Sequence, residues 1–592
     1  MLASLLCPTG DEMPPSATGD DACSAWNPGI QPGIPSEYRP LETILRQESV
    51  SSTLEEVSEL AQLTGLKHEE LVAFRPERLA LHELIVRVTA EIVVAEGAEE
   101  EEFGRNFREI VAAIWQRDVL PHLTELAHLH AQLRARAMTR IRRVLEESLF
   151  RPATGTPPPR HRFPFNLLRN SQPTAAAAEP QPDDEYRVIA AYRTSAVAAR
   201  DPLERAVYRS LHRVLGRMAA TRGRVGPDQE LLQRLVCNHV ANGYGSQLIG
   251  QALDPLVDAA IAREGYTRIR NREAPVLISL KGASAAGKSS LRPMLKRLMR
   301  EQGIEPDGYA TISPDVWRRV LLDYDSLGPA YKYAGPLTSR EVMVIDGKLD
   351  RYIRRRADRD GRVPHFLVDR FRFDSFSSEQ VERVLHNTYA KYVDTMYMYF
   401  VVTAPEETVE RGWRRGLERG RYKAVEDFLG HSVEAYVGMP RLLFKWLDYA
   451  RPRFRYFFLD NMVPKGTFPR TIAHGTQAEM TVLDPVGLVD IERFQKINLK
   501  ARSPDAVYPA TADLAPERNC AFLRQCLRRI ATVHFVERNS GATYLRARGG
   551  EFERVDMPAF ARVLRDPECA AILRELAPEL VPAIEREDAT AP

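Results

Sequence analysis

Short apolar runs alternate with amphipathic helical patterns between residues 271 and 465. Runs of this length, each followed by a helical stretch, are typical of a parallel sheet whose strands are connected by helices. The runs expected to form strands are Val276–Leu280, Tyr309–Ile312, Val363–Val368, Tyr397–Val402 and Tyr456–Leu459. The pattern predicts an α/β core, and functional groups in such sheets collect at the carboxyl ends of the strands.

Helical periodicity dominates the chain before this core. Residues 39–150 and 184–270 carry apolar side chains at helical spacing, with breaks expected at 222–227 and 243–245. Residues 151–183 are rich in proline and alanine and have the composition of a linker. Residues 1–38 mix Pro, Gly, Ser and Asp, so we expect a disordered tail.

Two local patterns stand out in the helical half. Residues 52–55 read Ser-Thr-Leu-Glu, the form of a capping box that opens a helix through Leu63. Ala61, Gly65 and Leu71 have the spacing of a helix-turn-helix, but Glu69 and Glu70 would face the DNA phosphates. A plain helical hairpin is therefore the favoured interpretation.

A basic run follows in the same half, with five arginines between residues 134 and 143. Such a run is usually a solvated helix face, and an anionic partner is the alternative.

The chain after the core predicts a smaller α+β region. Val533–Glu537 and Ala542–Arg546 resemble two strands around a turn, and residues 557–576 have a helical pattern that Pro578 would end. The regions that we predict are a tail at 1–38, a helical domain at 39–150, a linker at 151–183, a helical region at 184–270, the α/β core at 271–465 and an α+β appendage at 466–592.

Composition narrows the class of protein. The 592 residues include 82 basic and 80 acidic side chains, so the overall charge indicates binding neither to nucleic acid nor to a membrane surface. No apolar run has the ~18 residues that span a bilayer. The six cysteines include no C-x-x-C pair and the histidines form no metal-ligand motif. We expect a cytoplasmic protein, with no membrane contact and no structural metal.

A loop of small residues follows the first predicted strand and matches G-x-x-x-x-G-K-[ST] from Gly282 to Ser289. Between a strand and a helix, this pattern turns its N–H groups toward a phosphate, points its lysine at the β- and γ-phosphates and offers its hydroxyl to Mg²⁺. The sequence therefore predicts ATP and Mg²⁺ as ligands. The residues expected at the nucleotide are Gly282, Ala283, Ser284, Ala285, Ala286, Gly287, Lys288, Ser289 and Ser290.

Charged side chains follow the second and third predicted strands. Asp315 follows the second strand, where a carboxylate could accept a proton from an attacking hydroxyl, and Arg318 lies three residues on. The alternative role of Asp315 is that of a helix N-cap. Asp369 ends the third strand and could hold Mg²⁺ together with Ser289. Arg370 and Arg372 would then face a phosphate or an anionic substrate.

Arginines recur at helical spacing after the fourth predicted strand. They are Arg411, Arg414 or Arg415, and Arg419, and glycines follow at 416 and 420. Downstream of a phosphate loop, such a segment favours a lid over a solvated face, because its charges can stabilise a phosphoryl group in transfer.

These elements, in this order, resemble the zeta-toxin family of P-loop kinases over about residues 272–465. The resemblance rests on the phosphate loop, on Asp315-Val316-Trp317-Arg318, on the lid and on Asp460-Asn461. It implies that Asp315 is the base toward a sugar hydroxyl and that Glu341 contacts the substrate. Two departures concern the acceptor pocket: Trp317 stands where Phe is usual, and Asp369-Arg370-Phe371 replaces Glu-Gly-Thr.

We therefore expect a kinase that transfers the γ-phosphate of ATP to a hydroxyl of a nucleotide-like or sugar-nucleotide metabolite. The expected catalytic residues are Asp315, Lys288, Arg411 and Arg415, the substrate residues are Arg318, Glu341, Arg370 and Arg372, and the metal ligands are Ser289 and Asp369. The helical half is a candidate for a protein partner or for self-inhibition. The alternatives are a polynucleotide-end kinase, although nucleic acid is not the favoured partner, and an ATPase switch without a phosphorylated acceptor.

Overall fold

The computed structural model describes residues 23–97, 100–150, 182–301, 303–305, 308–370 and 391–580. This part of the chain forms two compact units. The helical unit comprises residues 40–84 and 115–258, and the α/β unit comprises residues 23–39, 85–114 and 259–580. The two helical regions expected from the sequence are thus largely one unit, while the C-terminal region groups with the α/β core. The expected linker lies, but for its last two residues, outside the described residues.

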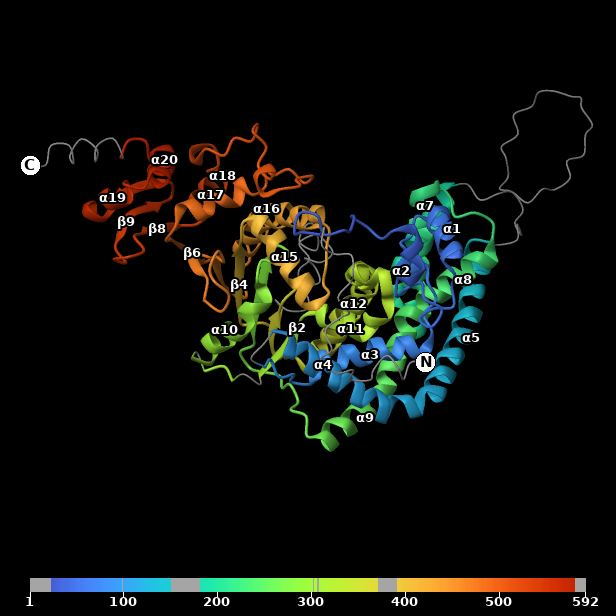
Figure 1. Ribbon diagram of the computed structural model, residues 1–592. Coiled ribbons are helices and arrows are strands. Elements are labelled where there is room, and N and C mark those ends of the chain that lie inside the picture. The colour runs from blue at the N-terminus through green and yellow to red at the C-terminus, as the bar shows by residue number, and fades with distance from the viewer. Residues whose placement is uncertain are drawn as a thin grey trace, which may run out of the picture. The chain divides into compact units, whose positions relative to one another are not determined.

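Helices make up most of the described part of the helical unit (Figure 1). Two of its helices continue into residues of the other unit, namely α3 and α9. The helices that contribute to this unit are α1 (Leu54–Thr64), α2 (His68–Leu71), α3 (Pro76–Glu91), α5 (Leu123–Ser148), α6 (Pro182–Ala198), α7 (Pro202–Arg222), α8 (Gln229–Val240) and α9 (Ser246–Glu264).

The first hairpin of this unit differs from the sequence pattern in detail. The N-cap of α1 is Thr53, whose hydroxyl accepts from the Glu56 N–H, while the Ser52 hydroxyl accepts from the Ala73 N–H. The helix α2 is a single turn, and its Glu70 forms an ion pair with Arg213. A one-turn helix with an engaged carboxylate supports the hairpin interpretation over DNA reading.

The glycine-rich segment at 243–245 does not break the chain's helical course. Residues Ala241–Gly245 form a π-helical turn that leads directly from α8 into α9. An extra residue in the turn keeps the hydrogen-bonded helix continuous, so the break expected here is wrong. The break at 222–227 is confirmed, because α7 ends at Arg222 with Gly223 in the left-handed conformation.

The basic run on α5 is partly engaged inside the helical unit. Arg134 donates to the Asn238 side chain, and Arg140 forms an ion pair with Glu204. Arg136, Arg142 and Arg143 are exposed. The run is therefore a mixture of packing contacts and solvated face.

A ten-stranded mixed sheet forms the centre of the α/β unit, in the order β10-β9-β8-β7-β6-β5-β4-β1-β3-β2. The strands β5, β4, β1, β3 and β2 are parallel. Their bounds agree with the predicted runs within a few residues, which confirms an α/β fold. The strands are β1 (Val276–Gly282), β2 (Tyr309–Ile312), β3 (His365–Val368), β4 (Thr395–Val402), β5 (Arg453–Asp460), β6 (Arg470–Thr476), β7 (Glu479–Val482), β8 (Thr532–Val536), β9 (Thr543–Arg548) and β10 (Glu551–Arg554).

The strand β1 lies between β3 and β4, and all seven of its residues are buried. The chain passes from β1 to β2 and β3 on one side and then to β4 on the other, so the order reverses at β1. Ligands of open α/β sheets bind at such a reversal, beyond the carboxyl ends of the strands. The helices α10 (Lys288–Glu301) and α16 (Val425–Leu447) both contact β1.

Helices from two separate parts of the sequence meet at the end of β2. The helix α4 (Glu100–Ile114) contacts the short helices η8 (Pro314–Trp317) and α11 (Arg318–Leu321) at the end of β2. The segment η9 (Asp325–Tyr333) leads into the long helix α12 (Ala334–Asp360).

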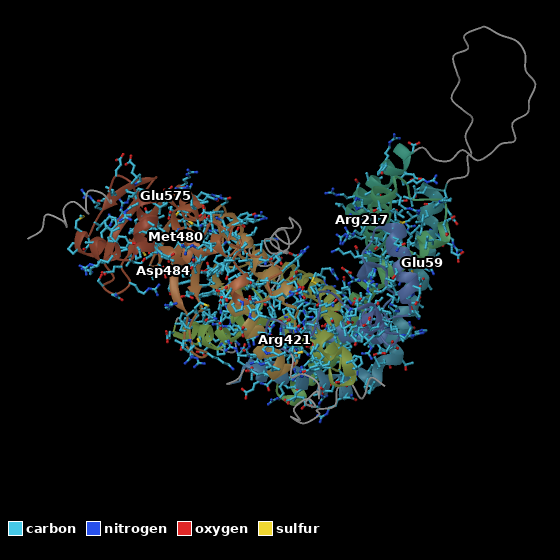
Figure 2. The ribbon with its side chains drawn as sticks, turned by 45° about the horizontal axis from the view of Figure 1, so that its top comes forward. Glu59, Arg217, Arg421, Met480, Asp484 and Glu575 are labelled. Carbon is cyan, nitrogen blue, oxygen red and sulfur yellow. The ribbon has the colours of Figure 1, made fainter. Side chains whose placement is uncertain are left out.

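The C-terminal region extends the same sheet instead of forming a separate appendage. Strand β6 pairs antiparallel with β5, and the pairing continues through β7 and β8. The predicted hairpin is confirmed as β8 and β9, whereas the predicted helix over 557–576 is two helices separated by a turn before Pro567. Met480, Asp484 and Glu575 mark this region in Figure 2. Its helices are α17 (Pro485–Arg493), α18 (Ala521–Arg529), α19 (Met557–Val563) and α20 (Pro567–Leu576).

The expected disordered tail is ordered from residue 23 onward, and residues 1–22 lie outside the described part. Ala25 and Trp26 belong to a buried cluster with Val409 of helix α15 (Pro405–Arg419) and with Phe428. The Trp26 indole N–H donates to the Glu410 carboxylate at 2.8 Å. The low apolar content of this segment predicted disorder, but the buried contacts of Trp26 anchor it to α15.

Among the helices that the structure describes, none combines the length and the apolar composition needed to cross a bilayer.

Gly412 of α15 lets the Phe428 ring of α16 pack against the helix backbone. A Cβ at Gly412 would lie 2.0 Å from the Phe428 Cζ. Because Phe428 is buried in the cluster described above, we expect Gly412→Ala to lower the free energy of unfolding of the α/β unit by about 1–3 kcal/mol.

Gly430→Ala on α16 is the matched control, since nothing lies within 4 Å of its added Cβ. Because alanine has a higher helix propensity than glycine, this change should leave the free energy of unfolding unchanged or raise it by up to ~1 kcal/mol. Urea unfolding of both variants makes the comparison, and equal midpoints would contradict this packing.

Candidate functional site

The predicted phosphate loop joins β1 to α10 at the point where the strand order reverses. Ala285 and Gly287 adopt left-handed backbone conformations, with φ angles of 62° and 90°. A Cβ at Gly287 would lie 2.2 Å from the Asn461 Nδ2. Glycine is therefore required at 287 both by the backbone angle and by the close approach of Asn461.

Two side chains from neighbouring strands hold the loop in place. The Asn461 amide donates to the Ala286 carbonyl at 2.7 Å, and the Thr403 hydroxyl donates to the same carbonyl at 3.2 Å. Thr403 follows β4 and Asn461 follows β5. Neither residue was expected from the sequence to have this role, although its place directly after a parallel strand was a signal that could have identified it.

Lys288 is buried at the start of α10 and turns back onto its own loop. Its Nζ donates to the carbonyls of Gly282 at 3.0 Å and Ala283 at 2.8 Å. Burial lowers the pKa of the Lys288 ammonium, against the raising effect of Asp369 and Asp315. The ammonium is thus held by neutral carbonyls in a place where an anion would bind it more strongly.

Ser289 and Asp369 meet as predicted for metal ligands. The Ser289 hydroxyl donates to the Asp369 Oδ2 at 3.0 Å, and the Arg292 guanidinium lies 3.9 Å from the same oxygen. One hydroxyl and one carboxylate suit Mg²⁺, which takes its other ligands from water and phosphate oxygens. Nowhere in the described part of the chain do three or more His, Cys, Asp or Glu side chains gather as a possible metal site.

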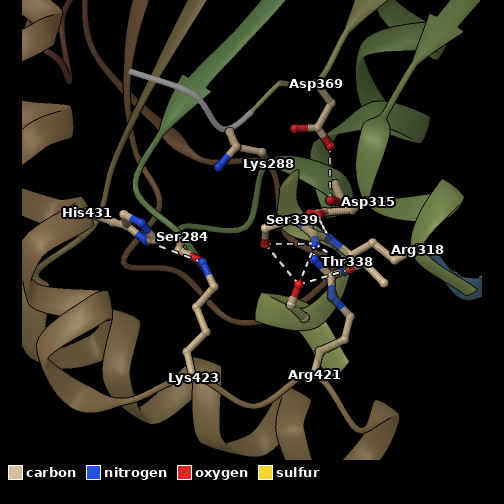
Figure 3. Close-up of polar contacts among 12 residues, drawn as sticks. Ser284, Lys288, Asp315, Arg318, Thr338, Ser339, Asp369, Arg421, Lys423 and His431 are labelled. Atoms are coloured by element: carbon tan, nitrogen blue, oxygen red, sulfur yellow. Dashed lines mark hydrogen bonds and ion pairs between the residues drawn. The ribbon is translucent and has the colours of Figure 1, made fainter. Parts of the chain in front are cut away.

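Asp315 lies on η8, after β2, between two arginines (Figure 3). Its Oδ1 accepts from Arg318 Nε at 2.9 Å and its Oδ2 accepts from Arg421 at 2.5 Å. The N-cap of η8 is Ser313, so the capping alternative for Asp315 does not apply. Burial would raise the pKa of Asp315, but the charges of Arg421 and Arg318 together lower it well below its usual value.

Arg318, predicted to contact substrate, fixes Asp315 to α12. Its guanidinium also donates to the Gly335 carbonyl at 2.7 Å and to the hydroxyls of Thr338 at 2.8 Å and Ser339 at 3.2 Å. Figure 3 shows these groups converging beside Asp315. The Arg318 guanidinium therefore sets the orientation of the Asp315 carboxylate.

The lid arginines lie close to the phosphate loop. Arg411 donates to Glu407 at 2.8 Å and to the Asn461 carbonyl at 2.9 Å, which ties α15 to the end of β5. The charge of Arg415 reaches Lys288 and Asp315, since it contributes to the pKa shift of both.

The remaining predicted substrate residues have different surroundings. Arg370 is buried and forms ion pairs with Asp346 at 2.8 Å and Asp350 at 2.9 Å on α12, so its charge serves to hold β3 to that helix. Glu341 is fully buried on α12. Arg372 lies outside the described residues.

Lys423 and His431 lie at the same place and had no role in the sequence prediction. The Lys423 Nζ donates to the Ser284 hydroxyl at 3.1 Å and lies 3.3 Å from the His431 Nδ1 (Figure 3). Burial, with Arg415, lowers the pKa of Lys423 to about 7. The charge of Lys423, with burial, lowers the pKa of His431 to about 3. The position of Lys423, a basic residue between the predicted lid and the next helix, was the sequence signal that could have identified it.

Comparison of the chain with protein-family models, with curated proteins and with solved structures found no match. The inference of function therefore rests on the geometry of the site and on the resemblance of its motifs.

We predict that Lys423→Met raises the pKa of His431 toward its ordinary value of 6.5, because the Lys423 charge is the largest cause of the shift. A ¹H–¹³C NMR titration of the His431 ring measures this pKa in both proteins. A midpoint that stays near 3 in the variant would contradict the assigned cause.

The same shift affects stability. Unfolded His431 binds a proton between about pH 6.5 and 3 while the folded residue does not, so its contribution to stability is lost as the pH falls through that window. The Lys423→Met protein should lose less stability than the wild type between pH 7 and pH 5.

Proposed function

We propose that this protein is a P-loop kinase that transfers the γ-phosphate of ATP to a hydroxyl group of a small nucleotide-like or sugar-nucleotide metabolite. The observation that carries the proposal is the convergence of the phosphate loop, the Ser289–Asp369 pair and Asp315 at one edge of a parallel sheet. A phosphate site, a metal site and a candidate base are the parts that phosphoryl transfer requires.

The loop supplies the phosphate site. Positive-φ residues followed by a helix N-terminus are the features with which such loops bind phosphate through backbone N–H groups, and Lys288 lies at the end of this loop. Anchoring by Asn461 and Thr403 keeps this arrangement fixed before a ligand arrives, so little reorganisation accompanies binding.

Ser289 and Asp369 would hold Mg²⁺, the first through its hydroxyl and the second directly or through water. Bound Mg²⁺ would neutralise charge on the β- and γ-phosphates. The Arg292 guanidinium, 3.9 Å from the Asp369 Oδ2, adds a positive charge beside this pair.

Asp315 would accept the proton of the acceptor hydroxyl as its oxygen attacks the γ-phosphorus and the bond to ADP breaks. Its low pKa means that it is a carboxylate at neutral pH. Arg421 occupies one of its oxygens, so the acceptor would take the place of that guanidinium. Arg421, released from Asp315, would then be near the phosphoryl group that moves.

The alternative hypothesis of a polynucleotide-end kinase is less well supported by the structure than by the sequence, because Arg134 and Arg140 of the basic run make contacts within the helical unit. The ATPase switch is an outcome of the experiment below.

The decisive experiment follows label from γ-labelled ATP into a metabolite extract. We expect the wild type to label a small molecule and Lys288→Ala to abolish the transfer. We expect Asp315→Asn to slow it by about 10²–10⁴-fold, the range of general base catalysis. Asp325→Asn, at an exposed aspartate ten residues on, should transfer at the wild-type rate.

Two results would overturn the kinase. Label that appears only as inorganic phosphate, at a rate that Asp315→Asn does not change, would establish the ATPase switch. Label that enters only oligonucleotides, in a salt-sensitive reaction, would establish the polynucleotide-end kinase.

A further inference from the structure

Lys423 contacts the phosphate loop from a different segment of the chain than Lys288, which begins α10. It lies in the short segment between α15, which ends at Arg419, and α16, which begins at Val425. Its Nζ donates to the hydroxyl of Ser284, the second residue after β1. The loop is thus contacted by two lysines, one from α10 and one from a segment more than 130 residues away.

The backbone around Lys423 is held firmly, so the direction of its side chain is set by packing. Gly420 ends α15 in the left-handed conformation. The Tyr422 ring is buried and packs against the rings of Trp413 at 5.6 Å and Tyr331 at 5.9 Å between centroids. A lysine fixed in this way points to a defined spot without a large loss of rotamer entropy on binding.

The charges that face Lys423 are mostly positive. Arg415 of α15, Arg318 of α11, Arg421 of the same segment and His431 of α16 are cationic or can become so, whereas Asp315 and Asp427 oppose them. Arg318 and Arg421 are already engaged with Asp315. The group therefore has an excess of positive charge that a polyphosphate would neutralise.

We propose that Lys423 is a phosphate-binding residue that rests on Ser284 in the free protein and moves onto the phosphates of the nucleotide. This inference rests on the proposed function, because the ligand is the same MgATP. It adds a residue that the motif does not contain.

A measurable consequence follows for protons. Free Lys423 is mostly neutral at pH 8, since its pKa is lowered to about 7. A neighbouring phosphate favours the ammonium form, so binding should take up about 0.9 of a proton at pH 8 and about 0.1 at pH 6. Lys288 and His431 can also take up protons when phosphate binds, so the share of Lys423 is the difference in uptake between the wild type and a variant without this lysine.

The test is calorimetric titration with the Mg²⁺ complex of a non-hydrolysable ATP analogue, in buffers of different ionisation enthalpy at pH 8. For the wild type we expect close to one proton taken up and an affinity that falls nearly tenfold from pH 8 to pH 9. Lys423→Met should bind more weakly at pH 7 and without this uptake. Lys423→Arg should keep the affinity and also lose the uptake, because a guanidinium is always charged.

Lys500→Met, at an exposed lysine of the same unit, is the control and should match the wild type. Uptake that is equal in the wild type and Lys423→Arg, or absent in the wild type, would overturn the role of Lys423 while leaving nucleotide binding intact. A wild type that binds no nucleotide at any pH would overturn the proposed function itself, and this inference with it.

Discussion

The site depends on the concentration of positive charge around one short loop. Lys288, Lys423 and His431 all have pKa values below their ordinary range, and each is affected by Arg415. Burial and like charge both disfavour the cationic forms of these side chains, and within the described residues Asp315 is the carboxylate that opposes the shift of all three. Such a site is suited to a polyanion, since a phosphate oxygen favours the cationic form of each of them.

The sheet makes this concentration possible by bringing five strand ends together. The loop follows β1, Asp315 follows β2, and Asp369, Thr403 and Asn461 follow β3, β4 and β5. Helices and segments from earlier in the chain support this arrangement, because α4 packs against the turn that carries Asp315 and Trp26 anchors residues 23–39 to α15. Removing residues 1–270 would therefore take away part of the α/β unit, and such a truncation does not isolate the helical half as a regulator.

Local patterns predicted the parallel strands, the strand–loop–helix arrangement around Gly282–Ser289 and the proximity of Ser289 to Asp369, because each depends on residues next to one another or on a strand end. Contacts between distant segments were not predictable in this way. The bond from Asn461 to Ala286 joins residues 175 apart, and that from Lys423 to Ser284 joins residues 139 apart. The continuation of the sheet from β5 into β6 was missed because periodicity alone does not say which strands pair. Gly243 and Gly245 suggested a helix break, but a π-helical turn accommodates both, with Gly245 close to Leu133 and His130 of α5.

The most direct test of the account is a crystal structure of the protein with Mg²⁺ and a non-hydrolysable ATP analogue. We predict that phosphate occupies the Gly282–Ser289 loop and that the Lys288 ammonium has left the carbonyls of Gly282 and Ala283 for phosphate oxygen. We also expect Mg²⁺ beside Ser289 and Asp369. A loop without nucleotide under saturating conditions, with Lys288 still on its own carbonyls, would contradict the central claim.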